Sequence, residues 1–197
     1  MRHAPDLADT TVVLDFDGAV VMHSPFGGVA GREAASALWD RLPRDEGTVA
    51  SAVRQVVVDP AFSRLVDDLR DEGAEILVIA DGLGPDARYV LAPFDVPLLA
   101  NDVDWATGEL TFPNADRCCS CATCGTCKQA PIQEIRDAGR TAVLVGANTT
   151  DAKAALLADV VFARDALARW CEEYGVAHTR FAGLADVHGS LVGGTRR

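Results

Sequence analysis

Two carboxylates, Asp15 and Asp17, stand two residues apart at the end of an apolar run and are followed by Gly18. Carboxylates at this spacing after a buried strand face the same crevice and repel each other unless a cation or a proton lies between them. Mg²⁺ prefers such oxygen ligands and often bridges to a substrate phosphate. The pair therefore predicts phosphate chemistry, with Asp15 attacking phosphorus and Asp17 protonating the leaving oxygen and then activating water. By itself the tetrapeptide 15–18 is also typical of a turn that ends a strand.

Four cysteines recur at every third position in one short segment: Cys118, Cys121, Cys124 and Cys127. Cys119 adds a further thiol, and Lys128 follows directly. Four thiolates in one loop suit a soft metal, so the spacing predicts a structural Zn²⁺ that fixes the loop, with Cys171 as another candidate ligand. The spacing also approaches the cysteine run of iron–sulfur proteins. Reduced thiols or a local disulfide are the remaining alternative.

The segments that position these residues alternate between strand and helix patterns. Three apolar runs, 11–15, 76–80 and 142–146, each end at polar or glycine-containing residues, and a shorter run follows at 160–162. Helical spacing joins them at 62–69, 128–138 and 152–157. Strands that alternate with helices predict an α/β fold with a Rossmann-like, doubly wound parallel sheet. In such a sheet the site forms beyond the carboxyl ends of the strands.

Two segments break this alternation. Residues 24–58 contain two helix patterns, at 33–42 and 46–56, separated by Pro43, and they predict a small helical cap inserted after the first strand. Residues 104–112 predict a β-hairpin with its turn at Thr107 and Gly108. We therefore expect a core domain of residues 1–23 and 59–197, and a cap of residues 24–58.

Several segments, in one order along the chain, resemble the signatures of the haloacid dehalogenase (HAD) superfamily: 15–18, 58–62, 79–82, 124–128, 145–151, 157–163 and 184–187. They are most similar to the phosphoserine-phosphatase-like branch, and within it to the 2-hydroxy-3-keto-5-methylthiopentenyl-1-phosphate phosphatase-like group. The resemblance covers most of the chain outside the cap. It implies the HAD fold and a Mg²⁺-dependent hydrolase that removes phosphate from a small phosphorylated metabolite.

The resemblance also assigns roles to individual residues. It makes Asp15 the nucleophile and a Mg²⁺ ligand, and Asp17 the acid and base, which also offers its backbone carbonyl to the metal. Lys128 corresponds to the lysine that holds the phosphate and offsets the crowding of negative charge. Without the resemblance, Lys128 would be expected to be a solvated residue at the start of a helix.

Three alanines depart from the pattern of the superfamily. Ala19 replaces a usual threonine, and Ala80 lacks the hydroxyl that normally contacts the phosphate, although backbone N–H groups around Asp81 and Gly82 can still face the anion. Ala147 stands where the main metal-binding carboxylate belongs. For that missing ligand the nearest substitutes are the carboxylate of Asp151 and the neutral oxygen of Asn148. Asn148 is also a candidate contact to the substrate.

Three functions are compatible with these residues. The first is a phosphomonoesterase that works through an aspartyl-phosphate, with a weakened or repurposed site. The second is a non-catalytic relative that keeps the fold to bind a ligand or a partner protein. The third is a metal-dependent or redox role of the cysteine loop.

The composition excludes other classes of function. Of the 197 residues 49% are hydrophobic, which suits one well-buried domain. A net charge of −11 argues against nucleic acid and anionic membranes as partners. The sequence shows no apolar run typical of a signal peptide or of a membrane span, so we expect a cytoplasmic protein. The sequence does not indicate an oligomeric state.

Overall fold

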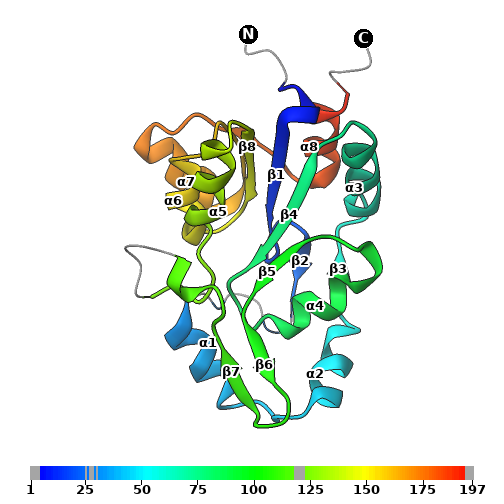
Figure 1. The fold of residues 1–197 in the computed structure, drawn as a ribbon, viewed down its shortest axis with the longest axis vertical. Coiled ribbons are helices and arrows are strands. Elements are labelled where there is room, and N and C mark those ends of the chain that lie inside the picture. Colours follow the sequence, from blue (N-terminus) through cyan, green and yellow to red (C-terminus); the bar gives the residue numbers. More distant parts are fainter. Residues whose placement is uncertain (1–4, 25, 27–28, 30, 118–122, 194–197) are drawn as a thin grey trace.

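The centre of the molecule is a parallel sheet of six strands in the order β10-β9-β8-β1-β4-β5 (Figure 1). The structure is a computed structural model that describes residues 5–24, 26, 29, 31–117 and 123–193. The sheet strands are β1 (Thr10–Asp15), β4 (Glu75–Ala80), β5 (Leu98–Ala100), β8 (Thr141–Gly146), β9 (Val160–Ala163) and β10 (Thr179–Arg180).

Strand β1 lies inside the sheet, between β4 and β8, and all of its residues are buried. Val13 is in register with Leu77 of β4 and with Leu144 of β8. Since successive side chains of a strand point to opposite faces, Val12 packs in the apolar cluster on one face and Val13 in the cluster on the other. Burial on both faces explains why the run is apolar throughout rather than alternating.

Helices cover both faces of the sheet. Helices α3 (Phe62–Asp71) and α8 (Leu184–Leu191) contact each other on one face, and α5 (Gln129–Asp137), α6 (Ala152–Ala155) and α7 (Asp165–Tyr174) cover the other (Figure 1). Four apolar residues of α3 at helical spacing are buried against the sheet: Phe62, Leu65, Val66 and Leu69. Gly73, with a positive φ of 82°, follows the end of this helix. The predicted α/β class with a doubly wound parallel sheet is confirmed.

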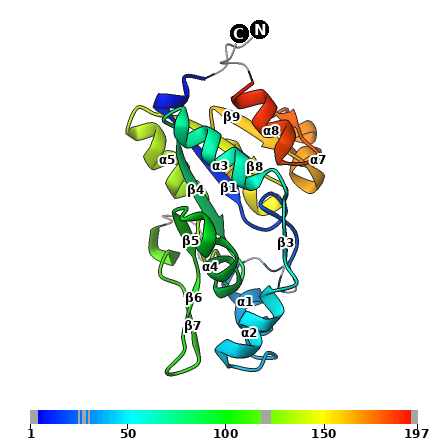
Figure 2. The same ribbon diagram turned by 90° about the vertical axis from the view of Figure 1, so that its right-hand side faces the viewer.

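Further elements lie beyond the carboxyl ends of β1 and β4 (Figures 1 and 2). They are α1 (Arg32–Trp39), α2 (Glu46–Val53), α4 (Pro85–Leu91) and a hairpin of β6 (Asp102–Asp104) and β7 (Glu109–Thr111). Two short strands, β2 (Val21–His23) and β3 (Val57–Val58), pair antiparallel. The chain therefore leaves the core and returns to it along neighbouring strands.

The hairpin and the inserted helices share one apolar cluster. The rings of Trp39 on α1 and Trp105 in the hairpin meet edge to face, with centroids 5.9 Å apart. Trp39 Nε1 also donates a hydrogen bond of 3.0 Å to the carbonyl oxygen of Gly108, at the hairpin turn. The sequence patterns predict these two segments as separate units, whereas in the structure they pack as one unit.

Some elements differ from their predicted extents. Helix α1 ends at Trp39 and residues 40–42 form a turn before Pro43, because the residue before a proline avoids helical backbone. The sequence patterns did not predict α7, β5 or β10. Among the described residues, no helix has the length and apolar character needed to cross a bilayer. The cap boundary at residues 24–58 stays a prediction.

Candidate active site

The site lies where β1, β4 and β8 end side by side. Asp15 closes β1, Asp81 follows β4, and the segment 147–151 follows β8. The turn after β1 is tight, and a Cβ on Gly18 would lie 2.8 Å from the Cβ of Ala147. Gly18 also has a φ of 94°, so both the space and the backbone conformation require glycine there. Parallel strand order thus brings together residues that are far apart in the sequence.

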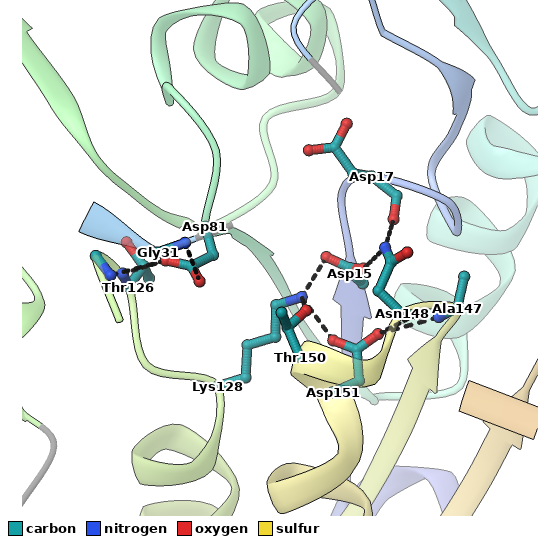
Figure 3. A network of polar contacts seen from close by, with 11 residues as sticks. Asp15, Asp17, Gly31, Asp81, Thr126, Lys128, Ala147, Asn148, Thr150 and Asp151 are labelled. Carbon is teal, nitrogen blue, oxygen red and sulfur yellow. Dashed lines mark hydrogen bonds and ion pairs between the residues drawn. The ribbon is translucent and has the colours of Figure 1, made fainter. Parts of the chain in front are cut away.

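Lys128 joins the nucleophile candidate to the segment after β8. Its ammonium lies 2.7 Å from Asp15 Oδ1 and 2.5 Å from Asp151 Oδ1 (Figure 3). All three side chains are buried, and Lys128 stands directly before α5, which fixes the direction from which it enters the site. One cation between two carboxylates gives a compact buried network whose parts depend on one another.

Burial and neighbouring charges set the protonation of this network. Burial alone would lower the pKa of Lys128, but Asp15 and Asp151 outweigh it, so the pKa is raised and the side chain stays an ammonium. Burial raises the pKa of Asp15, and the neighbouring Asp151 adds to that rise, whereas Lys128 opposes it. Donors around Asp15 are therefore needed to keep it ionised as a nucleophile.

Asp17 lies in a different electrostatic environment. Burial, and after it the charge of Asp86, raises the pKa of Asp17 to about 7. Its carboxylate turns away from Asp15 (Figure 3). A Cβ on Gly82 would lie 3.4 Å from Asp17 Oδ2, so this carboxyl faces Gly82. A carboxyl that titrates near neutral pH can both donate and accept a proton there.

Asn148 connects Asp15 to Asp17. Its Nδ2 donates a hydrogen bond of 2.8 Å to the backbone oxygen of Asp17 and lies 3.2 Å from Asp15 Oδ2 (Figure 3). The sequence predicts Asn148 as an oxygen ligand of Mg²⁺ or a contact to substrate, whereas in the structure its nitrogen bridges Asp15 and Asp17.

Both oxygens of Asp151 already have donors. Oδ1 accepts from Lys128, and Oδ2 accepts from the backbone N–H groups of Ala147 and Asn148, each at 3.0 Å. A Cβ on Gly146 would lie 2.5 Å from Oδ2, so this residue too is restricted to glycine. The carboxylate considered as a substitute Mg²⁺ ligand instead ties the loop after β8 to Lys128.

The side chain of Asp81 has a contact set that sequence reasoning missed. Oδ1 accepts hydrogen bonds from the backbone N–H groups of Gly125 at 2.9 Å and Thr126 at 2.7 Å, and Oδ2 accepts from that of Gly31 at 3.2 Å. Burial raises the pKa of Asp81, and these donors partly offset the rise. Asp81 thus links the segment before Lys128 to the residue before α1. The sequence offered only a general sign of this, because aspartates after strands often accept from loop N–H groups.

A cavity of about 180 Å³ opens at this network. Its described lining includes every candidate catalytic and substrate-binding residue: Asp15, Asp17, Asp81, Gly82, Lys128 and Asn148. The cavity is large enough to receive a phosphate group. A wider hollow of about 710 Å³ shares Asp81, Thr149 and Thr150 with it and carries Arg32, Glu33 and Lys153.

The described residues do not fit a preformed Mg²⁺ site. The oxygens that a cation could share between β1 and β8 are Asp15 Oδ2 and the Asp17 carbonyl, and both face the amide nitrogen of Asn148. Both oxygens of Asp151 are engaged by other donors, and Ala147 offers none. Mg²⁺ demands near-ideal octahedral oxygen ligation, which an amide N–H group opposes.

The predicted Zn²⁺ site falls partly outside the described residues, because they do not include Cys118 or Cys121. Cys127 is buried and Cys124 half-buried. Across the described part of the chain, no three histidine, cysteine or acidic side chains are grouped to hold a metal ion. Cys171 packs with Leu167 in the apolar cluster under α7, as a core residue does. The zinc site therefore stays a prediction.

Solved structures with a similar fold include phosphatases. A phosphoserine phosphatase from T. onnurineus matches with a TM-score of 0.63 and 17% identity, covering 98% of both chains. The cobalt-bound form of deoxy-D-mannose-octulosonate 8-phosphate phosphatase from Haemophilus influenzae matches with a TM-score of 0.54 and 14% identity, covering 95% of this chain and 92% of that one. These likenesses establish the fold of HAD phosphatases.

Relatives in sequence identify the branch of phosphatases to which the chain belongs. The chain is 33% identical over 165 residues to the 2-hydroxy-3-keto-5-methylthiopentenyl-1-phosphate phosphatase of Brevibacillus brevis. The match covers 79% of this chain and 73% of that protein. The enzyme of the same name from Exiguobacterium sibiricum is 27% identical over 139 residues, and this match covers 68% of this chain and 63% of that protein. No protein-family model matches. The chain belongs to the phosphoserine-phosphatase-like branch of the HAD superfamily, and homology supports phosphoric monoester hydrolysis as its class of reaction.

Proposed function

We propose that this chain hydrolyses the phosphate ester of a small metabolite through an aspartyl-phosphate on Asp15. The observation that carries the proposal is the buried contact between Lys128 and Asp15, 2.7 Å long, at a cavity that can hold a phosphate group. Asp17, with a pKa of about 7, lines the same cavity. A nucleophile, a fixed cation and an acid–base group thus surround one volume, as phosphoryl transfer requires.

In the first step a carboxylate oxygen of Asp15 forms a bond to phosphorus while the bond from phosphorus to the ester oxygen breaks. Asp17 gives its proton to the leaving oxygen, which departs as an alcohol. The Lys128 ammonium lies beside the reacting carboxylate and offsets the negative charge that gathers as the phosphate arrives. These two residues supply positioning and charge, the main protein contributions to phosphoryl transfer.

In the second step Asp17, now a carboxylate, takes a proton from a water molecule. The water oxygen bonds to phosphorus, the bond to Asp15 breaks, and inorganic phosphate leaves with the Asp15 carboxylate restored. Asp17 regains its proton in this step. A pKa near 7 allows one group to serve in both steps at neutral pH.

We propose that this site is weaker than that of an ordinary phosphatase. Ala80 is buried at the end of β4 and brings no hydroxyl to the cavity, and Ala147 brings no carboxylate. Each missing polar group removes stabilisation of the charged transition state. The bridge from Asn148 to Asp15 favours a second candidate, a non-catalytic phosphate-binding protein in which that hydrogen bond holds the nucleophile still.

We propose that the wider hollow beside the cavity receives the organic part of the substrate. Arg32, Glu33 and Lys153 line it with charge of both signs, which suits a small polar molecule. The relatives named above act, by their names, on 2-hydroxy-3-keto-5-methylthiopentenyl-1-phosphate, so this ester and phosphoserine belong at the head of a substrate panel.

The test is release of inorganic phosphate from that panel, in Mg²⁺ and separately in EDTA, by the wild type and by Asp15→Asn. Asp71→Asn, at an exposed residue at the end of α3, is the matched control. We expect release by the wild type and the control and none by Asp15→Asn. Equal turnover in Asp15→Asn would contradict the assignment of the nucleophile.

Restoration separates the two candidate functions. One outcome is that the wild type releases no phosphate but the double variant Ala80→Ser, Ala147→Asp does. The protein has then kept the fold of a phosphatase, but its own site no longer hydrolyses phosphate esters. That outcome rejects hydrolysis and favours the non-catalytic candidate. The circular dichroism spectrum of each variant is recorded beside its phosphate release, so that a loss of release caused by misfolding is recognised.

We propose further that the segment 118–127 binds Zn²⁺ through Cys118, Cys121, Cys124 and Cys127. The support is the spacing of four thiols directly before Lys128. Metal analysis of purified protein, with Cys124→Ser as a variant, tests it, and about one zinc per chain is expected. Protein without zinc, but with bound iron and visible absorbance, would contradict zinc and favour the iron–sulfur alternative.

A further inference from the structure

The amide group of Asn148 lies between two oxygens that belong to neighbouring parts of one turn. Nδ2 is 2.8 Å from the Asp17 carbonyl oxygen and 3.2 Å from Asp15 Oδ2. A side-chain amide has two N–H groups, so it can donate to both oxygens at once. Figure 3 shows the nitrogen directed at the two oxygens and the amide oxygen directed elsewhere. One uncharged donor thus holds these oxygens together.

The rest of the network leaves no other place for a cation among the described residues. Asp15 Oδ1 accepts from Lys128 at 2.7 Å, and Asp151 has donors on both of its oxygens. The Asp17 carboxylate turns away from Asp15 (Figure 3). To bind a divalent cation here, the protein must break both contacts of Asn148 and turn the carboxamide, and it still offers only one carboxylate oxygen.

The backbone around Asn148 holds this arrangement in place. The N–H of Asn148 donates to Asp151 Oδ2 at 3.0 Å, and Asp151 is itself fixed by Lys128. A Cβ on Gly18 would lie 3.5 Å from Asn148 Nδ2, so the amide packs against the turn after β1. The bridge is therefore part of the buried network and does not depend on a mobile surface side chain.

We propose that the carboxamide of Asn148 takes the place of a divalent cation in this cleft, holding Asp15 and the Asp17 carbonyl so that the site works without a metal. Asn148 is then a positioning residue, and Lys128 is the only cation among the described residues that line the small cavity. Only the expected effect on turnover rests on the proposed function, because metal binding is measured without any substrate.

The test measures binding of Mn²⁺, a paramagnetic substitute for Mg²⁺, by electron paramagnetic resonance. Three proteins are compared: wild type, the double variant Ala147→Asp, Asn148→Gly, and the control Gln55→Glu. The double variant removes the amide and supplies a carboxylate next to it. Gln55→Glu adds the same charge at an exposed residue that lines neither hollow of the site. The control therefore reports any gain caused by charge alone.

We expect no saturable Mn²⁺ binding by the wild type or the control. The double variant should bind Mn²⁺ saturably, at least about tenfold more tightly than any weak, non-saturating binding by the wild type, because groups around a metal change its affinity on this scale. Wild-type binding as tight as that of the double variant overturns the proposal. If the double variant does not fold, the wild type decides: saturable Mn²⁺ binding that broadens the ¹⁵N side-chain amide signal of Asn148 overturns the proposal, and no binding supports it.

Turnover separates this inference from the proposed function. Phosphate release that is equal in Mg²⁺ and in EDTA supports both. Release that requires Mg²⁺, together with Mn²⁺ binding by the wild type, keeps the phosphatase and overturns the role of Asn148. A wild type that binds no Mn²⁺ and releases no phosphate supports the role of Asn148 and rejects hydrolysis.

Discussion

Asp81 Oδ1 accepts a hydrogen bond of 2.7 Å from the backbone N–H of Thr126, two residues before Lys128. The same carboxylate accepts from Gly31, the residue before α1. One side chain at the end of β4 therefore positions both the loop of the buried lysine and the start of an inserted helix. Its role is to fix where these segments sit relative to β1.

Replacing Asp81 with alanine should loosen both segments at once. The variant leaves the N–H groups of Gly125, Thr126 and Gly31 without their acceptor, and an unmade buried hydrogen bond costs about 1–3 kcal/mol. We expect the free energy of unfolding to fall by about 2 kcal/mol or more, measured by urea denaturation. Asp71→Ala, at an exposed position, is the control and should change stability little. Equal stabilities of the two variants would contradict this role of Asp81.

Lys128→Met should destabilise the fold strongly. It removes the cation between Asp15 and Asp151, and breaking a buried ion pair by removing one partner costs about 3–5 kcal/mol. Lys128 opposes the rise in the pKa of Asp15, so without the ammonium Asp15 takes up a proton more readily in the folded state, and the loss should shrink as the pH falls. Adding Asp15→Asn should recover part of the stability. Independent, additive effects in the double-mutant cycle would show that the network is not coupled.

The charge of Asp86 should control the pH at which Asp17 works. Asp86 is buried, accepts a hydrogen bond of 3.1 Å from Ser24, and contributes to the raised pKa of Asp17. If Asp17 acts as the acid, turnover falls as the pH rises above about 7. Asp86→Asn removes a negative charge, so the pKa of Asp17 drops and the decline should begin at lower pH. The measurement is kcat/KM against pH, with Asp71→Asn as the control whose profile should not move.

The same raised pKa has a consequence for stability. Asp17 ionises near 3.8 as an unperturbed group and near 7 in the folded protein. Between these values the folded state holds a proton that the unfolded chain has released, so this group lowers stability as the pH rises to about 7. Asp17→Asn should therefore flatten the dependence of the unfolding free energy on pH in this range. An unchanged slope would show that Asp17 is not protonated there.

Trp39→Ala should separate the hairpin from the inserted helices. Trp39 is 3% exposed, meets Trp105 edge to face, and donates to the Gly108 carbonyl. Large-to-small changes of buried aromatic residues cost about 3–5 kcal/mol. We expect such a loss of stability, together with a higher KM for any substrate, because the elements beside the wider hollow are no longer held. Trp170→Ala, a half-buried tryptophan stacked on Tyr174 in α7, is the control and should leave KM unchanged.

The patterns that predict local structure succeeded where local interactions decide it. The runs at 11–15, 76–80 and 142–146 lie in β1, β4 and β8. Consecutive apolar residues are typical of a strand that is buried on both faces of a sheet. Gly73 and Gly139 take positive φ shortly after the helices predicted at 62–69 and 128–138, and Gly108 takes positive φ at the predicted hairpin turn. Helix α7 was missed, although Leu167, Ala168 and Cys171 form a buried face with helical spacing.

The sequence by itself determined the α/β class, the three strands that carry the site, and the identity of the candidate groups Asp15, Asp17 and Lys128. Only the tertiary structure decided what each group contacts: Asp81 accepting three backbone N–H groups, and the amide of Asn148 between Asp15 and Asp17. The reason is physical. Strand and helix patterns depend on residues a few positions apart, whereas these contacts join positions that are adjacent only after the sheet has formed, and differences of an ångström decide which oxygen meets which donor.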